Sequence, residues 1–367
     1  MKILVINPGS TSTKWAVYDD RTLLWKESVN HPTEQLEKYH RVNDQLPMRT
    51  NATLHALESA GIKPEFDCVI ARGGLLKPTP SGVYNVDAVL AADLLESKLE
   101  HACNLGGLIA RDVADRCGCP AFIADPEGVD ELMPEARITG IPEIKRLSVF
   151  HALNTKAVAR RYAWSQGHRY EDMNLILVHL GGGISVGAHR HGKVIDVNNA
   201  LNGDGPFSPE RAGTVPADQL VELCYSGRYN KRTIKRMLSG DGGLKAHFGT
   251  TDVKEISLRA SKGEEPYKSV LDAMIYNVAK CVGERAVALR GKVDAIILTG
   301  GIAHSEYCTK GISKWINWIA PVVIRAGEDE LDSLAFNAYE AMTGAVPVMT
   351  YDPDHKFDTP RTDRHNS

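Results

Sequence analysis

Two matching segments constrain what this chain can fold into, and in each a short turn of small residues joins two apolar runs. The first covers residues 3–19 (ILVINPGSTSTKWAVYD) and the second covers residues 175–196 (LILVHLGGGISVGAHRHGKVID). Aligned without gaps, the turn residues correspond one to one: Pro8 with Gly181, Gly9 with Gly182, and Ser10 with Gly183. Each segment predicts a β-hairpin, because its second run alternates apolar and polar residues.

The composition of these turns suits phosphate. Small residues bring backbone N–H groups and hydroxyls close to a bound anion. A single glycine turn more often only reverses the chain. Two such turns about half a chain apart predict duplicated lobes that hold one phosphate chain between them.

The bulk properties exclude several classes of protein. A length of 367 residues favours two domains, and the formal net charge of −3 without a basic cluster predicts no nucleic-acid partner. No run approaches the roughly 18 apolar residues of a membrane helix, and the apolar start is too short for a secretory signal. We therefore expect a cytoplasmic protein without membrane contact, whose seven cysteines are reduced thiols.

Apolar strands alternate with helices along the chain, which predicts an α/β fold. A buried strand that runs into a glycine turn is predicted at 68–74, and further buried strands are predicted at 121–124, 293–299 and 322–325. Helices are predicted at 33–59, 86–99, 104–117, 148–163, 217–225, 229–238, 266–290 and 331–342, followed from 350 by a polar tail that is either loose or wrapped on the surface. In such folds ligands gather where strands end, which singles out Arg72, Asp125, Gly300 and Glu328.

Two arginines have the surroundings of anion-binding groups. Arg72 stands between a predicted strand and a glycine pair, and Arg211 lies in the turn-rich segment 203–214 (GDGPFSPERAGT). A guanidinium in such a place needs an anionic partner and suits carboxylate or phosphoryl oxygens. A structural ion pair explains each arginine equally well.

Histidines and carboxylates supply further candidates. His101, His151 and His179 could donate hydrogen bonds to a transferring phosphoryl group, with His151 expected in the first turn of a helix. Asp125 and Glu328 each end a predicted strand, as carboxylates that hold magnesium do. The alternatives are structural histidines, a turn cap for Asp125 and a helix start for Glu328.

No GxxxxGK[ST] motif is present, so a hairpin turn with Ser12 and Lys14 would contact phosphate in place of a P-loop. The alternative for Lys14 is a solvent-facing lysine on a strand. The glycine pair Gly300-Gly301 could let an adenine ring lie on the backbone, although an ordinary strand-to-helix turn fits it as well.

These motifs resemble a known family. Residues 5–14 resemble the N-terminal signature of the acetate kinase family, in the superfamily of sugar kinases, actin and heat-shock chaperones. Residues 147–160 (LSVFHALNTKAVAR) resemble its second signature, 177–185 resemble its phosphate loop, and the match extends over nearly the whole chain. The resemblance implies two ribonuclease-H-like lobes, each a mixed sheet flanked by helices, with a nucleotide cleft between them. The lobes would be 1–148 plus 332–367, and 149–331.

The resemblance also implies residue roles. Nucleotide and phosphate contacts fall on Asn7, Ser10, Ser12, Lys14, Gly181, Gly182, Gly183, Asp252, Gly300 and Gly301. Stabilisation of the transferring phosphoryl group falls on Arg72, His151 and Arg211, with His101 and His179 nearby. Magnesium-linked acids match Asp125 and one carboxylate of the 328–330 run, with Glu328 the candidate.

Segments 203–214 and 327–330 resemble the butyrate kinase branch of the family more closely than its acetate kinases. Acetate kinases carry bulkier residues where this chain has Gly73 and Gly74, so these glycines are expected to leave room for a longer acyl chain, with Phe207 in the same pocket. One methylene changes such discrimination by only about 1–3 kcal/mol.

We therefore expect reversible phosphoryl transfer from ATP to butyrate, giving butyryl phosphate and ADP, with Mg²⁺ as cofactor. A carboxylate acceptor is already ionised at neutral pH, so no general base is needed. Other short-chain acids (isobutyrate, propionate, acetate) are alternative substrates, and an actin-like or chaperone-like nucleotide switch is an alternative function. A kinase for a hydroxyl substrate would need an aspartate base. A homo-oligomer, dimer or higher, is expected.

Overall fold

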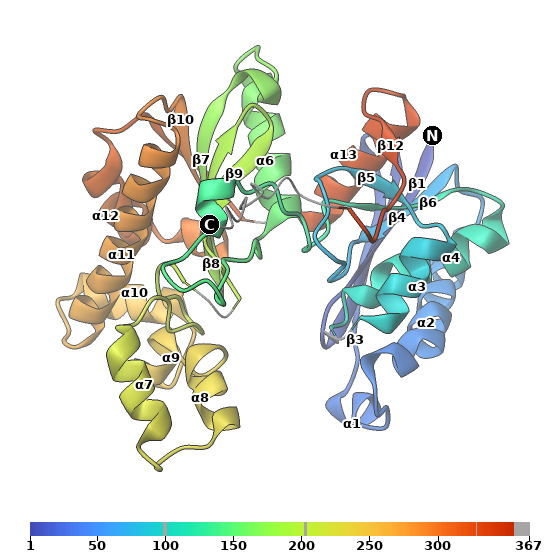
Figure 1. Cartoon of the computed structure of the whole chain (residues 1–367). Helices are drawn as coiled ribbons and strands as arrows, with labels where there is room; N and C mark the ends of the chain where they lie inside the picture. The colour runs from blue at the N-terminus through green and yellow to red at the C-terminus, as the bar shows by residue number, and fades with distance from the viewer. Residues whose placement is uncertain (98–100, 202–203, 328, 356–367) are drawn as a thin grey trace, which may run out of the picture. The chain divides into compact units, whose positions relative to one another are not determined.

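The computed structural model describes residues 1–97, 101–201, 204–327 and 329–355 (Figure 1). The chain divides into two compact units: unit 1 is Met1–Asp130 with Asp329–Ser367, and unit 2 is Glu131–Glu328. The boundaries expected from the sequence, after 148 and after 331, lie later in the chain. No helix in the described part of the chain is long and apolar enough to cross a membrane.

Unit 1 is built around a mixed sheet with the strand order β12-β5-β6-β4-β1-β2-β3. Its strands are β1 (Lys2–Pro8), β2 (Ser12–Asp19), β3 (Thr22–Asn30), β4 (Cys68–Arg72), β5 (Val83–Asn85), β6 (Ala121–Ala124) and β12 (Val348–Met349). Its helices are α1 (Thr33–Leu36), a 3₁₀ turn (Val42–Gln45), α2 (Leu46–Ser59), α3 (Ala88–Glu96), α4 (Asn104–Cys117) and α13 (Glu330–Met342). Strands β1, β4 and β6 run parallel, and β1, β2 and β3 are antiparallel neighbours.

The two faces of this sheet are covered by different helices. Leu4 and Ile6 of β1 belong to a buried cluster with residues of α3 and α4. Because side chains alternate along a strand, Ile3 and Val5 point to the opposite face, and both are fully buried. Helix α13 packs against β1 and β4 on that side (Figure 1). The last helix of the described residues, α13, therefore covers one face of the first sheet.

Unit 2 repeats the plan with the strand order β11-β10-β7-β8-β9. Its strands are β7 (Asn174–Leu180), β8 (Ile184–Arg190), β9 (Lys193–Val197), β10 (Ala295–Gly300) and β11 (Val322–Ala326). Its helices are α5 (Pro134–Arg137), α6 (Ala152–Ser165), α7 (Ala217–Tyr225), α8 (Lys231–Leu238), α9 (Gly243–Phe248), α10 (Val253–Ser261), α11 (Tyr267–Ala288) and α12 (Glu306–Ile316), with 3₁₀ turns at Tyr170–Asp172 and Gly301–His304. Ile176 and Val178 pack with α10 and α11, whereas Leu175 and Leu177 pack with α6.

The strand order confirms the predicted duplication and fold class. In unit 1 the run β3-β2-β1-β4-β6 has the same order and directions as β9-β8-β7-β10-β11 in unit 2. Both predicted hairpins are present. Their turns differ in length, because Pro8 pairs with Thr13 but Leu180 pairs with Ile184. The gapless alignment was therefore wrong at the turn: Pro8 is the last residue of β1 and does not correspond to a turn glycine.

Two local predictions were also wrong. The helical region predicted at 33–59 is interrupted: α2 begins at Leu46, with Pro47 in its first turn, where proline favours a helix start. Strand β11 is an edge strand whose last three residues are exposed, although a buried strand was predicted. The tail from 350 was expected to be loose or wrapped on the surface, and its start fits the second alternative, since Tyr351 is buried and donates a hydrogen bond to Asp93.

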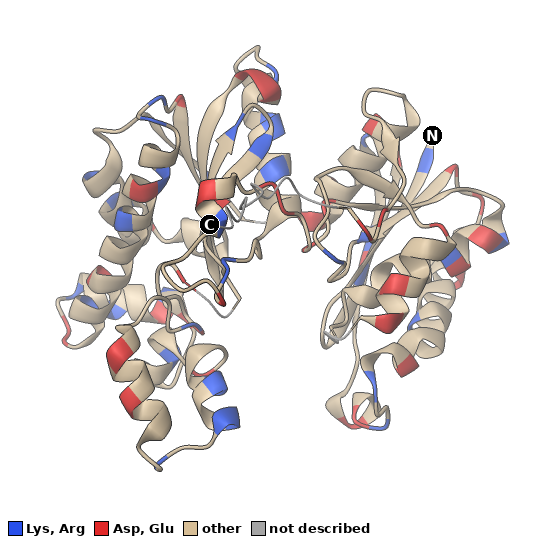
Figure 2. Ribbon diagram, viewed as in Figure 1, with Lys and Arg blue, Asp and Glu red and all other residues tan. Residues whose placement is uncertain are grey.

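Figure 2 shows basic and acidic residues interspersed along the helices of both units. Helix α8 carries four basic side chains that line one pocket: Lys231, Arg232, Lys235 and Arg236. This local cluster was not noticed in the sequence, and the absence of a nucleic-acid partner stays a prediction.

Candidate active site

In unit 1 the predicted phosphate-contacting residues surround the turn between β1 and β2. Asn7 is buried at the end of β1, and its Nδ2 donates to Oε2 of Glu330 at 2.6 Å. Ser10 is exposed in the turn, Ser12 is half-buried, and Lys14 points to solvent from β2. Lys14 therefore faces solvent, as the alternative prediction had it. Its ammonium group remains accessible to a ligand in this position.

Arg72 ends β4 and lies between two carboxylates. Its Nε donates to Oε1 of Glu127 at 2.6 Å, and its Nη1 is 3.0 Å from Oε1 of Glu330. The charge of Glu127, with a smaller contribution from Glu330, raises the pKa of Arg72 although burial opposes this shift. Asn7, Glu330, Arg72 and Glu127 thus form one continuous polar chain. The sequence did not reveal Glu127, and within the acidic run it did not single out Glu330.

The same cluster includes His101. Its Nδ1 lies 2.9 Å from Sγ of Cys103. Burial, and next the charge of Glu127, raises the pKa of the Cys103 thiol well above its ordinary value. His101 therefore contacts a neutral thiol next to the charged groups, and Cys103 is a second member of the cluster that the sequence did not single out.

Asp125 is buried directly after β6 with a φ of +40°. Its Oδ1 accepts hydrogen bonds from Ser81 Oγ at 2.5 Å and from the N–H of Gly82 at 3.1 Å. Both contacts are to the segment before β5 and neither is to the turn after Asp125 that was its alternative role, and the magnesium role stays a prediction. Glu328 lies outside the described residues, and among those described no group of three metal-ligating side chains is gathered.

Gly73 and Gly74 lie at close backbone approaches. A Cβ at Gly73 would be 2.5 Å from Cβ of Pro126, and one at Gly74 would be 2.6 Å from Cδ2 of Leu94 and 2.7 Å from Oδ1 of Asn104. Protein atoms therefore fill the space that was expected to admit a longer acyl chain. The space expected beside Gly73 and Gly74 is therefore absent, because Pro126, Leu94 and Asn104 pack against these two residues.

In unit 2 the glycines of the β7–β8 turn also allow close approaches. The carbonyl of Gly182 accepts from Ser208 Oγ at 2.5 Å, and a Cβ at Gly183 would be 2.7 Å from the carbonyl oxygen of Ala200. Gly300, with a φ of +87°, lets the end of β10 come so near β7 that a Cβ would be 2.5 Å from the oxygen of Leu180. Larger residues at these positions would displace the turn.

His151 and His179 stack against each other, with ring centroids 3.7 Å apart and planes 13° apart. Asn154 Nδ2 lies 2.9 Å from Nδ1 of His179; an amide nitrogen can only donate, so the proton of the neutral ring is on Nε2. That Nε2 lies 2.9 Å from where a Cβ of Gly181 would be. His151 precedes α6 as its N-cap and does not lie in the first turn as predicted; its Nδ1 is 3.0 Å from Ser185 Oγ.

Arg211 lies in the loop that follows β9. Its Nη1 is 3.2 Å from Oε2 of Glu210, while its Nε is buried and has no hydrogen-bond partner among the described residues. A buried N–H without an acceptor is costly, so this donor favours a bound anion.

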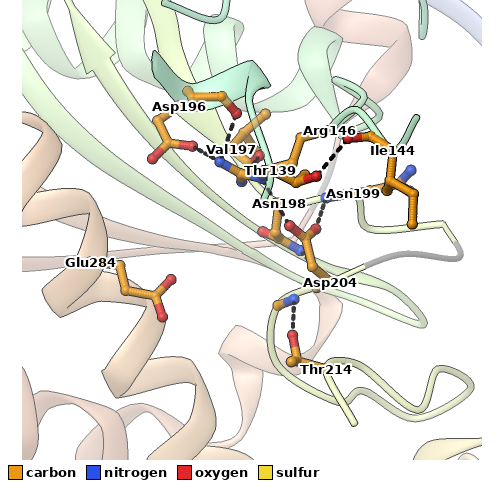
Figure 3. Close-up of polar contacts among 12 residues, drawn as sticks. Thr139, Ile144, Arg146, Asp196, Val197, Asn198, Asn199, Asp204, Thr214 and Glu284 are labelled. Carbon is orange, nitrogen blue, oxygen red and sulfur yellow. Dashed lines mark hydrogen bonds and ion pairs between the residues drawn. The ribbon is translucent and has the colours of Figure 1, made fainter. Parts of the chain in front are cut away.

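A network beneath this loop holds it in place (Figure 3). Arg146 donates through Nη1 to Asp196 Oδ1 at 2.9 Å and through Nε to Asp204 Oδ2 at 3.1 Å. The other oxygen of Asp204 accepts the N–H of Asn199 at 2.6 Å. The N–H of Ala200 donates to the carbonyl of Val149, two residues before His151. The loop, the stacked histidines and the glycine turn are therefore connected. No motif in the sequence marked Arg146, Asp196 or Asp204 as members of this network.

A pocket of about 1220 Å³ opens beside the β7–β8 turn. Four of the predicted nucleotide-binding residues line it: Gly181, Gly182, Asp252 and Gly301. Asp252 also caps α10 by accepting the N–H groups of Lys254 and Glu255. Phe207 packs against the hydrophobic core of unit 2 and is not among the lining residues.

Comparison with known proteins shows which family this chain resembles. A model of the acetokinase family matches residues 142–315. Probable butyrate kinase of Phocaeicola vulgatus is 60% identical over 96% of this chain and 100% of that protein. Probable butyrate kinase of Bacteroides thetaiotaomicron is 54% identical, again over 96% and 100%.

The fold agrees with this result. Acetate kinase of Porphyromonas gingivalis superposes with a TM-score of 0.73 at 18% identity, over 93% of this chain and 99% of that one. The high identity to full-length relatives settles what the resemblance in the motifs implied: this chain belongs to the acetokinase family.

Proposed function

We propose that this protein transfers the γ-phosphoryl group of ATP reversibly to butyrate, giving butyryl phosphate and ADP. The names of relatives that are 54% and 60% identical over nearly the whole chain support butyrate as the acceptor. The observation on the molecule that carries the proposal is Arg211, whose buried Nε has no protein acceptor and is available to an anion. A second cation, Arg72, is kept protonated by the carboxylates beside it.

In unit 1, Arg72 would orient the butyrate carboxylate. An oxygen of that carboxylate forms the new bond to the γ-phosphorus while the bond to the β–γ bridging oxygen breaks, and ADP leaves with that oxygen. No proton moves, so no general base is required. Glu127 and Glu330 occupy donors of Arg72 in the ligand-free protein. Butyrate would replace one of these contacts.

In unit 2, the β7–β8 turn and the pocket beside it would hold the nucleotide. Asp252 and Gly301 line this pocket and are proposed to contact the nucleoside. The Nε2–H of His179 lies beneath Gly181, where it could donate to phosphate oxygens. Arg211 would stabilise charge on the transferring group, which is the largest contribution that a site of this kind can make.

The described carboxylates fit Mg²⁺ chemically. Mg²⁺ is usually held by one or two carboxylates together with waters and phosphate oxygens, so a cluster of three protein ligands is not required. We propose Asp125 and one carboxylate of the 328–330 run as its ligands. When bound, the ion would neutralise phosphate charge. A homo-oligomer in the cytoplasm completes the proposal, and the free cysteines suit that compartment.

Incubation with ATP, Mg²⁺, butyrate and hydroxylamine tests the reaction, because only an acyl phosphate yields a hydroxamate. Parallel assays with acetate, propionate and isobutyrate rank the acceptors. Hydroxamate from butyrate at a higher kcat/KM than from acetate is the expected result. ATP hydrolysis without hydroxamate would instead indicate a nucleotide switch, and phosphorylation of an alcohol would indicate the hydroxyl kinase.

A further inference from the structure

A buried arginine lies behind the turn between β1 and β2. Arg49, in α2, is 0% exposed. Its Nη1 donates to the carbonyl of Gly9 at 2.9 Å and to that of Ser12 at 3.1 Å, and its Nη2 donates to the carbonyl of Ser10 at 3.0 Å. A single guanidinium therefore holds three carbonyls of this turn.

The charge of Arg49 is not balanced by a carboxylate. Its remaining contacts are also neutral: Nη1 lies 3.2 Å from Thr13 Oγ1, and Nε lies 3.1 Å from Gln45 Oε1. Burial lowers the pKa of Arg49 to about 10, which leaves it protonated at neutral pH. No carboxylate pairs with it anywhere in the described ranges.

Two other buried cations show how unusual this is. Lys156 is 1% exposed and lies 2.8 Å from Glu131, and Arg285 is 4% exposed and lies 2.6 Å from Asp196. A buried charge is costly unless it is paired. The charge of Arg49 is buried against neutral acceptors alone, at a turn that the sequence predicts to contact phosphate.

The contacts also determine what the turn presents to solvent. Its carbonyls point inward to Arg49, while Ser10 and Thr11 are exposed. Over the described ranges, the N–H groups of Ser10 and Thr11 donate to no acceptor. A turn with carbonyls drawn inward and N–H groups left outward is an anion-binding arrangement.

We propose that Arg49 is a positioning residue for the nucleotide phosphates. It fixes the outward orientation of the turn, and the bound phosphate balances its charge from the other side. This inference rests on the proposed function and on the expectation from the sequence that the β1–β2 turn contacts the nucleotide phosphates. It assigns the nucleotide affinity of unit 1 partly to a side chain that does not touch the ligand.

The test compares Arg49→Met, Arg49→Lys and the wild-type chain by calorimetric binding of ADP. Loss of a charge-assisted contact predicts that Arg49→Met weakens ADP binding by about tenfold or more. The KM for butyrate at saturating ATP should stay within about twofold, since the acceptor is bound elsewhere. A merely structural role would lower the melting temperature without separating the two substrates.

Thr53→Val is the matched control. Thr53 lies in the same helix, accepts a hydrogen bond from Trp15 Nε1 at 3.0 Å and does not contact the turn. Its substitution should lower stability and leave ADP affinity unchanged. Arg49→Lys keeps the charge but cannot span three carbonyls, so it decides the question if Arg49→Met fails to fold. Wild-type ADP affinity in the lysine variant overturns the inference.

The two proposals fail separately. Weak ADP binding by Arg49→Met, in a protein that forms no butyryl phosphate, rejects the proposed acceptor and retains the role of Arg49. Normal ADP binding by a folded Arg49→Met, in a protein that does form butyryl phosphate, rejects the role of Arg49 and retains the function.

Discussion

Helix α4 passes close to the end of β4 at Gly106, and this approach sets the position of Arg72. A Cβ at Gly106 would lie 2.3 Å from the carbonyl oxygen of Arg72 and 3.4 Å from Cβ of Ala71. In Gly106→Ala the first distance must grow from 2.3 Å to at least 3.0 Å, a shift of about 0.7 Å. Strand β4 is hydrogen-bonded on both sides, to β1 and β6, so backbone rather than a flexible side chain must give way.

The expected costs follow from that shift. Overpacking of this kind costs about 1–3 kcal/mol, and the better helix propensity of alanine returns about 1 kcal/mol, so stability should fall by at most about 2 kcal/mol. Activity should fall much further. A displacement near 1 Å of a substrate-orienting group can reduce the rate by about a hundredfold. We expect kcat for butyrate to drop by about ten- to a hundredfold while the protein remains folded.

Urea unfolding and the hydroxamate assay measure the two quantities in the same samples. Gly283→Ala in α11 is the control, because a Cβ there meets no atom within 4 Å. It should gain up to about 1 kcal/mol of stability and keep normal kcat. If Gly106→Ala behaved like Gly283→Ala in both assays, the reasoning from the close approach would be refuted.

Three further predictions concern single side chains. Arg211→Lys removes the Nε donor and should lower kcat by about ten- to a thousandfold, and unchanged steady-state kinetics would count against its role. Glu330→Gln weakens the charge-assisted contacts to Arg72 and Asn7 and should lower the free energy of unfolding in urea by about 1 kcal/mol; wild-type stability would contradict this. Burial holds the pKa of His189 well below 6.5, so the unfolded chain binds more protons and stability falls as the pH drops below about 6.5. His189→Gln should flatten this slope between about pH 7.5 and about pH 5.5, and equal slopes would exclude the assignment.

Local signals predicted the framework of both units. The bounds expected for the helices at 104–117 and 217–225 agree with α4 and α7, because each has an uninterrupted helical pattern between clear breaks. Both hairpins were predicted because the signals for a hairpin, namely the turn residues and the alternation of the strands, lie within a few residues of one another in the sequence. Strand β3 was missed because most of its residues are exposed and only Trp25 and Val29 pack against the core, which leaves a weak apolar pattern.

Long-range contacts account for what the sequence did not reveal at the site. Arg49 reaches a turn 40 residues earlier in the chain, and Glu127 meets Arg72 across 55 residues. Neither lies in a motif, so no local pattern marks them. The prediction of free space beside Gly74 failed for the same reason, because the residues that fill this space lie far away in the sequence. They are Leu94 of α3 and Asn104 of α4.

The path of the chain through unit 1 has a consequence for biosynthesis. Unit 2 is a continuous segment, whereas α13, which packs on β1 and β4, is made only after all of unit 2. A ribosome therefore releases the first sheet with Ile3 and Val5 uncovered, and keeps it so while nearly two hundred more residues are synthesised. Until α13 has been synthesised, that face of the sheet is an exposed hydrophobic surface that is prone to aggregation. Nascent chains should therefore depend on chaperones most strongly during this interval.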